Sequence, residues 1–140
     1  MPASLAPRVD TFIDSNVLLY LLDDDVAKAT RAEAVLANGG VVSAHVLGEV
    51  TNVLRGRRWN RPWSDVHTVL RAIRANTIVL PVSDVTHARG VEYAERFQLQ
   101  FFDALHLASA VLANCTTLWT EDMHNGLIVD GCTIRNPFKA

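Results

Sequence analysis

The segment Asp103-Ala-Leu-His-Leu-Ala-Ser-Ala-Val-Leu-Ala113 is apolar over nearly its whole length. Its composition favours a helix, and a helix that is apolar on all sides is stable only where every face is covered. We therefore expect this helix to lie between a sheet and other helices. That position predicts a layered fold in which helices pack on a central sheet.

The rest of the chain alternates between short strands and helices. The β-branched and aromatic runs predict strands at 9–13, 41–43, 77–80 and 116–119, and a hairpin over 127–134 that turns at Asp130-Gly131. The helical patterns fall at 15–22, 27–37, 44–55, 65–74 with Ser64 as N-cap, 84–97 and 103–113. This order predicts an α/β fold with a mainly parallel central sheet flanked by helices.

Length and composition fit one soluble domain. The chain has 140 residues, of which 49% are hydrophobic and 20% charged, so we expect a single domain over residues 1–140. A net charge of −2 gives no overall basic field. The longest apolar run, 17–22, is too short to span a membrane, and no export signal is apparent, so we expect a cytoplasmic protein. Cys115 and Cys132 form no CxxC pair and are expected to be reduced thiols packed in or near strands.

Four acidic residues lie at or soon after the predicted carboxyl ends of strands. They are Asp14 after the first strand, Glu49 in the helix after the second, Asp103 at the start of the apolar helix, and Asp122 after the fourth strand. In open α/β sheets, ligands bind outside the carboxyl ends of the strands. We therefore expect these carboxylates to converge at one edge of the sheet.

Each acid has a simpler interpretation when it is taken alone. Asp14 and Asp103 could be helix N-caps, because aspartate accepts hydrogen bonds from the free N–H groups of a first turn. Glu49 could be a solvated helix residue, and Asp122 an ordinary loop residue. The case for a shared site rests on the four acids together.

Converging carboxylates would need a cation. Two like unit charges about 5 Å apart repel by roughly 3 kcal/mol at an effective dielectric near 20. Such a cluster raises pKa values or binds a cation, and ligands that are all oxygen favour Mg²⁺ or Mn²⁺ over zinc. These ions activate water and stabilise charge on a phosphodiester, so the acids favour a metal-dependent nuclease.

Four motifs, in chain order, resemble those of a known family. They are Phe12-Ile-Asp-Ser-Asn-Val-Leu-Leu-Tyr20, Ser43-Ala-His-Val-Leu-Gly-Glu-Val-Thr-Asn-Val-Leu54, Phe102-Asp-Ala-Leu105 and Leu118-Trp-Thr-Glu-Asp-Met123. Together they resemble the PIN-domain family, and their pattern is most similar to the VapC-type toxins of toxin–antitoxin pairs. The similarity runs from about residue 9 to residue 138.

The resemblance implies an endoribonuclease that hydrolyses RNA phosphodiester bonds with metal-activated water. The cofactor it implies is Mg²⁺, with Mn²⁺ as a substitute. The residues that match its catalytic, metal-holding positions are Asp14, Glu49, Asp103 and Asp122, and those that match its supporting positions are Asn16 and Thr120. The partners it implies are an RNA substrate, a cognate antitoxin of a type II pair that blocks the site, and a second copy of the chain in a homodimer, with no membrane.

Two neighbours of these positions are open to more than one interpretation. Glu121 precedes Asp122 and could replace it as a ligand. His106 lies one helical turn after Asp103 and can approach the same face. The family motif gives His106 no task, so we expect it to be a supporting or packing residue. The five histidines have no HExxH or paired spacing, which argues against a zinc site.

The segment Leu54-Arg-Gly-Arg-Arg-Trp-Asn-Arg-Pro-Trp63 is the other candidate for nucleic-acid contact. Arginine binds phosphate well and indoles stack on unpaired bases, so Arg57 and Arg58 are possible RNA contacts. The alternative is a solvated loop between helices whose tryptophans close the core.

Two other functions are weighed against the ribonuclease. One is a non-catalytic PIN-like module that binds RNA or a protein. The other is an acid-rich phosphohydrolase acting on small molecules, for which no supporting motif is present. A complete set of acids favours the enzyme.

Overall fold

The computed structural model describes residues 9–139 and contains a mainly parallel sheet. Its strands are β1 (Thr11–Ile13), β2 (Gly40–Ser43), β3 (Thr77–Leu80), β4 (Thr117–Trp119), β5 (Ile128–Val129) and β6 (Cys132–Arg135). Among the described residues they form one sheet in the order β3-β2-β1-β4-β6-β5. Every neighbouring pair is parallel except β5 and β6. The predicted α/β fold with a mainly parallel sheet is confirmed.

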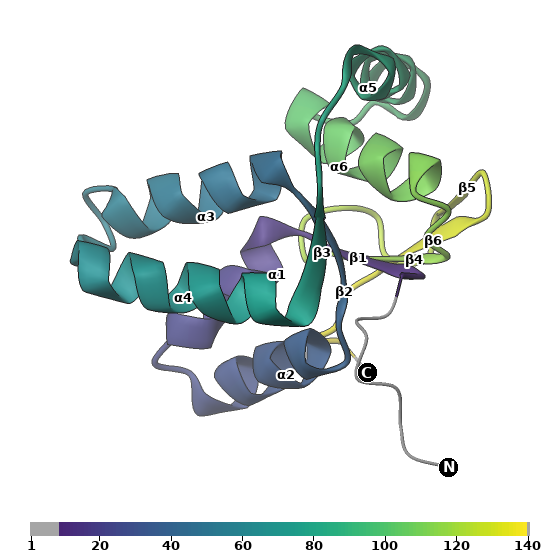
Figure 1. Ribbon diagram of the computed structural model, residues 1–140. Helices are drawn as coiled ribbons and strands as arrows, with labels where there is room; N and C mark the ends of the chain where they lie inside the picture. The colour runs from purple at the N-terminus through teal and green to yellow at the C-terminus, as the bar shows by residue number, and fades with distance from the viewer. Residues whose placement is uncertain (1–8, 140) are drawn as a thin grey trace.

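Helices flank this sheet on both sides. They are α1 (Ser15–Leu19), the 3₁₀ turn η1 (Tyr20–Leu22), α2 (Val26–Ala37), α3 (Ala44–Arg55), α4 (Trp63–Asn76), α5 (Asp84–Phe97) and α6 (Phe101–Leu112). In the view of Figure 1, α5 and α6 lie above the sheet, α2 lies below it, and α3 and α4 extend to its left. Across residues 9–139, none of the helices combines the length and the apolar character needed to cross a membrane.

Helix α6 occupies the covered position that its composition predicts. All residues from Ala104 to Ala110 are buried, between α5 on one side and β2 and β4 on the other. The helix begins at Phe101, two residues earlier than predicted, because the side-chain oxygen of Gln100 accepts a hydrogen bond from the backbone N–H of Asp103 at 3.1 Å. Gln100 is therefore the N-cap, and the interpretation of Asp103 as a cap is wrong.

Other predicted boundaries divide into confirmed and corrected ones. The elements at 44–55, 77–80 and 84–97 have their predicted bounds. The first strand begins at Thr11, where its pairing with β4 begins, and the helix predicted at 15–22 changes to a 3₁₀ turn at Tyr20. The N-cap assigned to Ser64 is wrong, since α4 begins at Trp63 and Pro62 precedes it. The extended Pro62 accepts hydrogen bonds at its carbonyl oxygen from the N–H groups of the first turn, at 3.0 and 3.2 Å.

Glycines permit two close backbone arrangements. At Gly40, the first residue of β2, a Cβ atom would lie 2.9 Å from the Thr11 hydroxyl, so a side chain there would force β1 and β2 apart. The predicted hairpin turn is confirmed: Asp130 and Gly131 both have positive φ, at 46° and 87°, as the tight turn between β5 and β6 requires.

Both cysteines are buried and free, as predicted. Burial raises the pKa of Cys115 to about 12 and that of Cys132 to about 11. Both therefore remain protonated at neutral pH and act as small apolar side chains.

Candidate metal centre

The parallel order of β2, β1 and β4 brings three segments of the chain to one edge of the sheet. Asp14 follows β1, α3 with Glu49 follows β2, and Thr120 follows β4. The backbone N–H of Asp14 donates to the carbonyl oxygen of Trp119 at 3.0 Å, which extends the β1–β4 ladder by one residue. The carboxylate of Asp14 is thereby held at the carboxyl end of the central strand.

Asp14 is only 3% exposed, and its side chain is held by the two predicted supporting residues. Its Oδ2 atom accepts a hydrogen bond from Thr120 Oγ1 at 2.8 Å and one from Asn16 Nδ2 at 3.4 Å. Asn16 Nδ2 also lies 3.2 Å from Thr120 Oγ1. Although Asp14 occupies the N-cap position of α1, its side chain makes no cap hydrogen bond, so the capping interpretation is wrong for this residue too.

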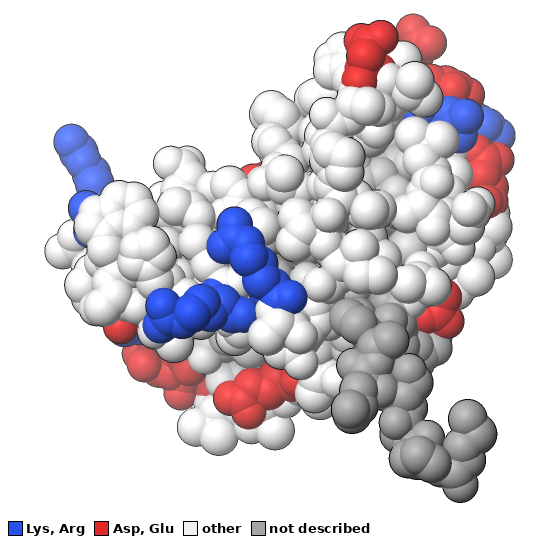
Figure 2. Space-filling model, in the orientation of Figure 1, with Lys and Arg blue, Asp and Glu red and all other residues white. Residues whose placement is uncertain are grey.

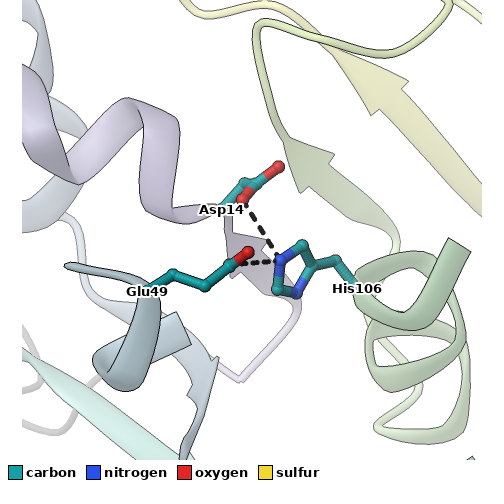
Figure 3. A group of neighbouring side chains, drawn as sticks. All are labelled: Asp14, Glu49 and His106. Atoms are coloured by element: carbon teal, nitrogen blue, oxygen red, sulfur yellow. Dashed lines mark hydrogen bonds and ion pairs between the residues drawn. The ribbon is translucent and has the colours of Figure 1, made fainter. Parts of the chain in front are cut away.

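Asp14, directly after β1, Glu49 on α3 and His106 on α6 point toward one another (Figure 3). His106 Nε2 lies 2.6 Å from Glu49 Oε1 and 3.5 Å from Asp14 Oδ1. The hydroxyl of Ser15 lies between the two carboxylates, 3.2 Å from Asp14 Oδ1 and 3.1 Å from Glu49 Oε1. The side chain of His106, 2% exposed, thus reaches the carboxylates directly from the buried helix.

The pKa shifts of His106 and Glu49 are those expected of an ion pair. Burial by itself lowers the pKa of His106, but the hydrogen bond to Glu49 and the charges of Asp14 and Glu49 outweigh it and raise this pKa. Burial by itself raises the pKa of Glu49, but the hydrogen bond and charge of His106 outweigh it and lower this pKa. Both shifts favour an imidazolium that donates from Nε2 to the Glu49 carboxylate.

The pKa of Asp103 indicates that negative charge at this site is not fully balanced. Its half-buried carboxyl has a pKa raised from 3.8 to about 6, first by desolvation and then by the negative charges of Asp14 and Asp122, which the positive charge of His106 only partly offsets. Asp103 therefore lies within electrostatic reach of Asp14, Glu49 and Asp122. A cation there would relieve the repulsion that raises this pKa.

Glu121 and Asp122 have different surroundings, although they are adjacent. Glu121 Oε1 accepts a hydrogen bond from the Tyr20 hydroxyl at 2.6 Å, and its Oε2 lies 3.4 Å from the ammonium group of Lys28. Asp122 is exposed, and its backbone N–H donates to Thr120 Oγ1 at 3.3 Å. Glu121 therefore already has a cation and a hydroxyl as partners, and Asp122 is the acid whose charge acts on Asp103.

The residues present fit a divalent cation. One ligand atom each from Asp14, Glu49 and His106 lie within 4.8 Å of one another, and the carboxyl group of Asp103 is near enough to respond to their charges. The sequence predicts only a supporting or packing position for His106, and it gives Ser15 no role. The sequence features that point to them are a single histidine in an apolar helix and a hydroxyl directly after Asp14. Tertiary packing decides which helix faces meet, and the sequence pattern does not specify it.

Arg57 and Arg58 are exposed in the loop between α3 and α4. On the side of the molecule that Figure 2 shows, Lys and Arg lie in separate small groups, one of them among acidic side chains at the upper right, with much uncharged surface between the groups. The distribution agrees with the small net charge and favours local basic contacts over one broad basic face.

Comparison with solved structures finds the same fold in toxin proteins. The Mycobacterium tuberculosis toxin VapC20, which cleaves the sarcin–ricin loop, has a TM-score of 0.64 at 21% identity, covering 80% of this chain and 89% of that one. A toxin–antitoxin complex from Klebsiella pneumoniae has a TM-score of 0.70 at 18% identity, covering 93% and 99%. VapBC2 from Rickettsia felis, bound to a DNA fragment of its promoter, has a TM-score of 0.64 at 15% identity, covering 90% and 97%.

Comparison of the sequence with curated proteins gives no significant match. A comparison with family models does: the model of the PIN domain matches residues 11–124, which include β1, β4 and all four predicted acids. The resemblance seen in the four sequence motifs is thereby confirmed. This chain belongs to the PIN domain family.

Proposed function

We propose that the protein is a Mg²⁺- or Mn²⁺-dependent endoribonuclease and the toxin of a toxin–antitoxin pair. The observation that carries the proposal is the convergence of Asp14, Glu49 and His106, which offer ligand atoms within 4.8 Å of one another. The pKa of Asp103, raised to about 6 by desolvation and by the charges of Asp14 and Asp122, supports it. Membership of the PIN family supports the nuclease, and the toxin–antitoxin structures with this fold support the pairing.

Each residue has a proposed task. Asp14, Glu49, Asp103 and Asp122 hold the cation, and His106, whose Nε2 lies 2.6 Å from Glu49 Oε1, positions the Glu49 carboxylate. Thr120 and Asn16 orient the Asp14 carboxylate through the hydrogen bonds to its Oδ2 atom. A bound cation supplies activated water and stabilises charge on the phosphate. Arg57 and Arg58 attract the RNA backbone.

Two proposed partners follow from the same relatives. An antitoxin is expected to cover the acidic edge and prevent RNA from reaching it, as the toxin–antitoxin complexes with this fold suggest. A homodimer is proposed by analogy with the family. Growth arrest on expression, relieved by co-expression of the adjacent gene product, would support the toxin assignment. Unimpaired growth with active protein present would contradict it.

The experiment that tests the nuclease is a titration of Mn²⁺ and Mg²⁺ into protein mixed with a fluorescently labelled single-stranded RNA. We expect product to appear only with metal, and we expect Asp14→Asn to lower the cleavage rate by at least about 10³-fold, since it removes one charge from the centre of the site. Its amide still offers an oxygen acceptor to Thr120, so the fold should be retained, as circular dichroism would show.

Glu95→Gln on α5 is the matched control, because it makes the same chemical change at an exposed acid on another element. It should cleave as the unchanged protein does. If Asp14→Asn retains full activity, the mechanism is wrong. If the unchanged protein binds RNA yet yields no metal-dependent product, the non-catalytic binding module is the better function.

A further inference from the structure

Two hollows lie side by side next to the metal centre and together form a trough. The first, about 260 Å³, is lined by Asn16 and Asp122 at the end near the acids, and by Tyr20. The second, about 390 Å³, extends along the loop between α3 and α4. Arg58 and Trp59 line both hollows. The trough therefore begins at Asn16 and Asp122, beside the acids, and extends past Arg58 and Trp59.

Arg58 is the arginine of this loop that is both free and in the trough. Arg55 lies with its guanidinium 4.6 Å from the ring centre of Trp63 and donates to the carbonyl oxygen of Arg61. Arg61 donates to the carbonyl oxygen of Leu22. Within residues 9–139, Arg58 has neither a hydrogen bond nor an ion pair, and it is exposed. Its guanidinium is available to a phosphate at no cost to the fold.

A nucleotide site also needs an aromatic surface for the base, and Trp59 offers one. It is partly buried against the core, which fixes its ring, yet it also lines both hollows, which leaves part of the indole uncovered. Stacking on such a ring favours any unpaired base, because every base has an aromatic face. A fixed, partly open indole costs little entropy on binding.

The charges in the trough decide which part of a nucleotide goes where. Besides Arg58, the first hollow is lined by three acidic residues, Asp23, Glu121 and Asp122. Their carboxylates repel a phosphate, but they accept hydrogen bonds from the N–H groups of an uncharged base. The phosphate is therefore held at Arg58, which both hollows share.

We propose that the trough is a nucleotide subsite for single-stranded RNA, in which an unpaired base beside the cleaved bond stacks on Trp59 and the phosphate next to it meets Arg58. This inference rests on the proposed ribonuclease function and names how that substrate is held. A base within a duplex is stacked on its neighbours and cannot enter the trough, so the site selects single strands and loops.

The first test measures binding to Asp14→Asn protein, which does not consume the RNA. Anisotropy of a labelled single-stranded RNA gives Kd for this protein and for variants with one further change. We expect Trp59→Leu to raise Kd about 10-fold and Trp59→Tyr, which keeps a ring, to restore most of the loss. Arg58→Gln should raise Kd about fivefold and reduce the salt slope by about 1.

Matched controls separate the trough from general effects. Trp63→Leu changes a tryptophan that lines neither hollow, and Arg74→Gln removes a charge near the other end of α4. Both should stay within twofold of the parent. An RNA with one base removed should bind more weakly only when the missing base belongs in the trough, and at that position Trp59→Leu should cause no further loss.

A second measurement does not depend on affinity. Binding of single-stranded RNA should quench tryptophan emission in the Asp14→Asn protein and in its Trp63→Phe variant, but much less in its Trp59→Phe variant. The subsite is overturned if the quench persists without Trp59, or if folded Trp59→Leu and Arg58→Gln proteins bind as their parent does. Absence of metal-dependent cleavage in the unchanged protein contradicts the proposed function instead, so the two failures are distinct.

Discussion

Two groups of acids meet at the edge formed by β1 and β4, and they differ in how their charge is balanced. The Glu121 group contains one carboxylate with a lysine at 3.4 Å and a tyrosine hydroxyl at 2.6 Å. The Asp14 group, with Glu49, Asp103 and nearby Asp122, has one buried histidine to balance it, and the pKa of Asp103 is raised. A carboxylate paired with a cation stabilises the fold, whereas a cluster of carboxylates with excess negative charge is suited to binding a cation.

The largest effect that separates the two groups is on cleavage. We expect Asp122→Asn to lower the cleavage rate in Mn²⁺ by about 100-fold, because it removes a carboxylate from the proposed cation site. Glu121→Gln makes the same change one residue earlier but in the balanced group, and it should stay within about threefold. The rates of both variants on one labelled RNA check this. The reverse order would mean that Glu121 is the ligand.

The next effect is on stability and concerns His106. His106→Gln removes the buried partner of Asp14 and Glu49 and leaves His45, 3.7 Å from Glu49 Oε2, as their remaining basic neighbour. We expect a loss of about 2 kcal/mol from urea unfolding of the metal-free protein. Because the pKa of His106 is raised, its contribution is complete below its unfolded value near 6.5 and disappears as the pH rises through its folded pKa. Glu49, with a lowered pKa, contributes above its ordinary value of 4.5.

The loss from His106→Gln should therefore be greatest between about pH 4.5 and 6.5 and should shrink by pH 9. His87→Gln, an exposed histidine on α5, is the control and should change little at any pH. A loss from His106→Gln that does not vary with pH would mean that the ring acts by packing alone.

The sequence predicts well those features that depend on the composition of one segment or on the order of the segments. The apolar segment from Ala104 to Ala110 predicts its own burial, and the order of strands and helices predicts a parallel sheet whose edge gathers the acids. Contacts between distant segments were not predictable in this way. Glu121 is distinguished from Asp122 by Lys28, which lies 93 positions earlier in the chain. His106 meets Glu49 across 57 positions, and the pattern of neither helix specifies that meeting.

Asp103 gives a smaller effect with the opposite sign. Its pKa rises to about 6 in the folded protein, so the folded state holds the proton more tightly and stability falls as the pH rises from about 4 to about 6. Asp103→Asn removes this penalty. We expect the metal-free variant to be more stable at pH 7 by about 1 kcal/mol, well below the full value of the shift, because water screens a half-buried group.

Thermal unfolding with and without Mn²⁺ checks this prediction. Without metal the Asp103→Asn protein should unfold at the higher temperature, and at pH 3 the two proteins should be alike. With saturating Mn²⁺ the unchanged protein should gain more, since it keeps the proposed ligand. A variant that is less stable than the unchanged protein without metal would show that Asp103 is not strained by its neighbours.

The smallest effect belongs to the balanced group. Tyr20→Phe removes only the hydroxyl, which donates to Glu121 at 2.6 Å and accepts from Lys28 Nζ at 3.1 Å. The ring keeps its edge contact with Phe138 at 4.7 Å, and Lys28 still lies 3.4 Å from Glu121. We expect a loss of about 0.5–1 kcal/mol in urea unfolding, because both lost hydrogen bonds join partly exposed groups. The loss should be the same with and without Mn²⁺, since Glu121 is not a proposed ligand. A loss that grows when Mn²⁺ is present would mean that Glu121 and the acids around Asp14 act as one unit, and the division between a balanced and an unbalanced group would have to be abandoned.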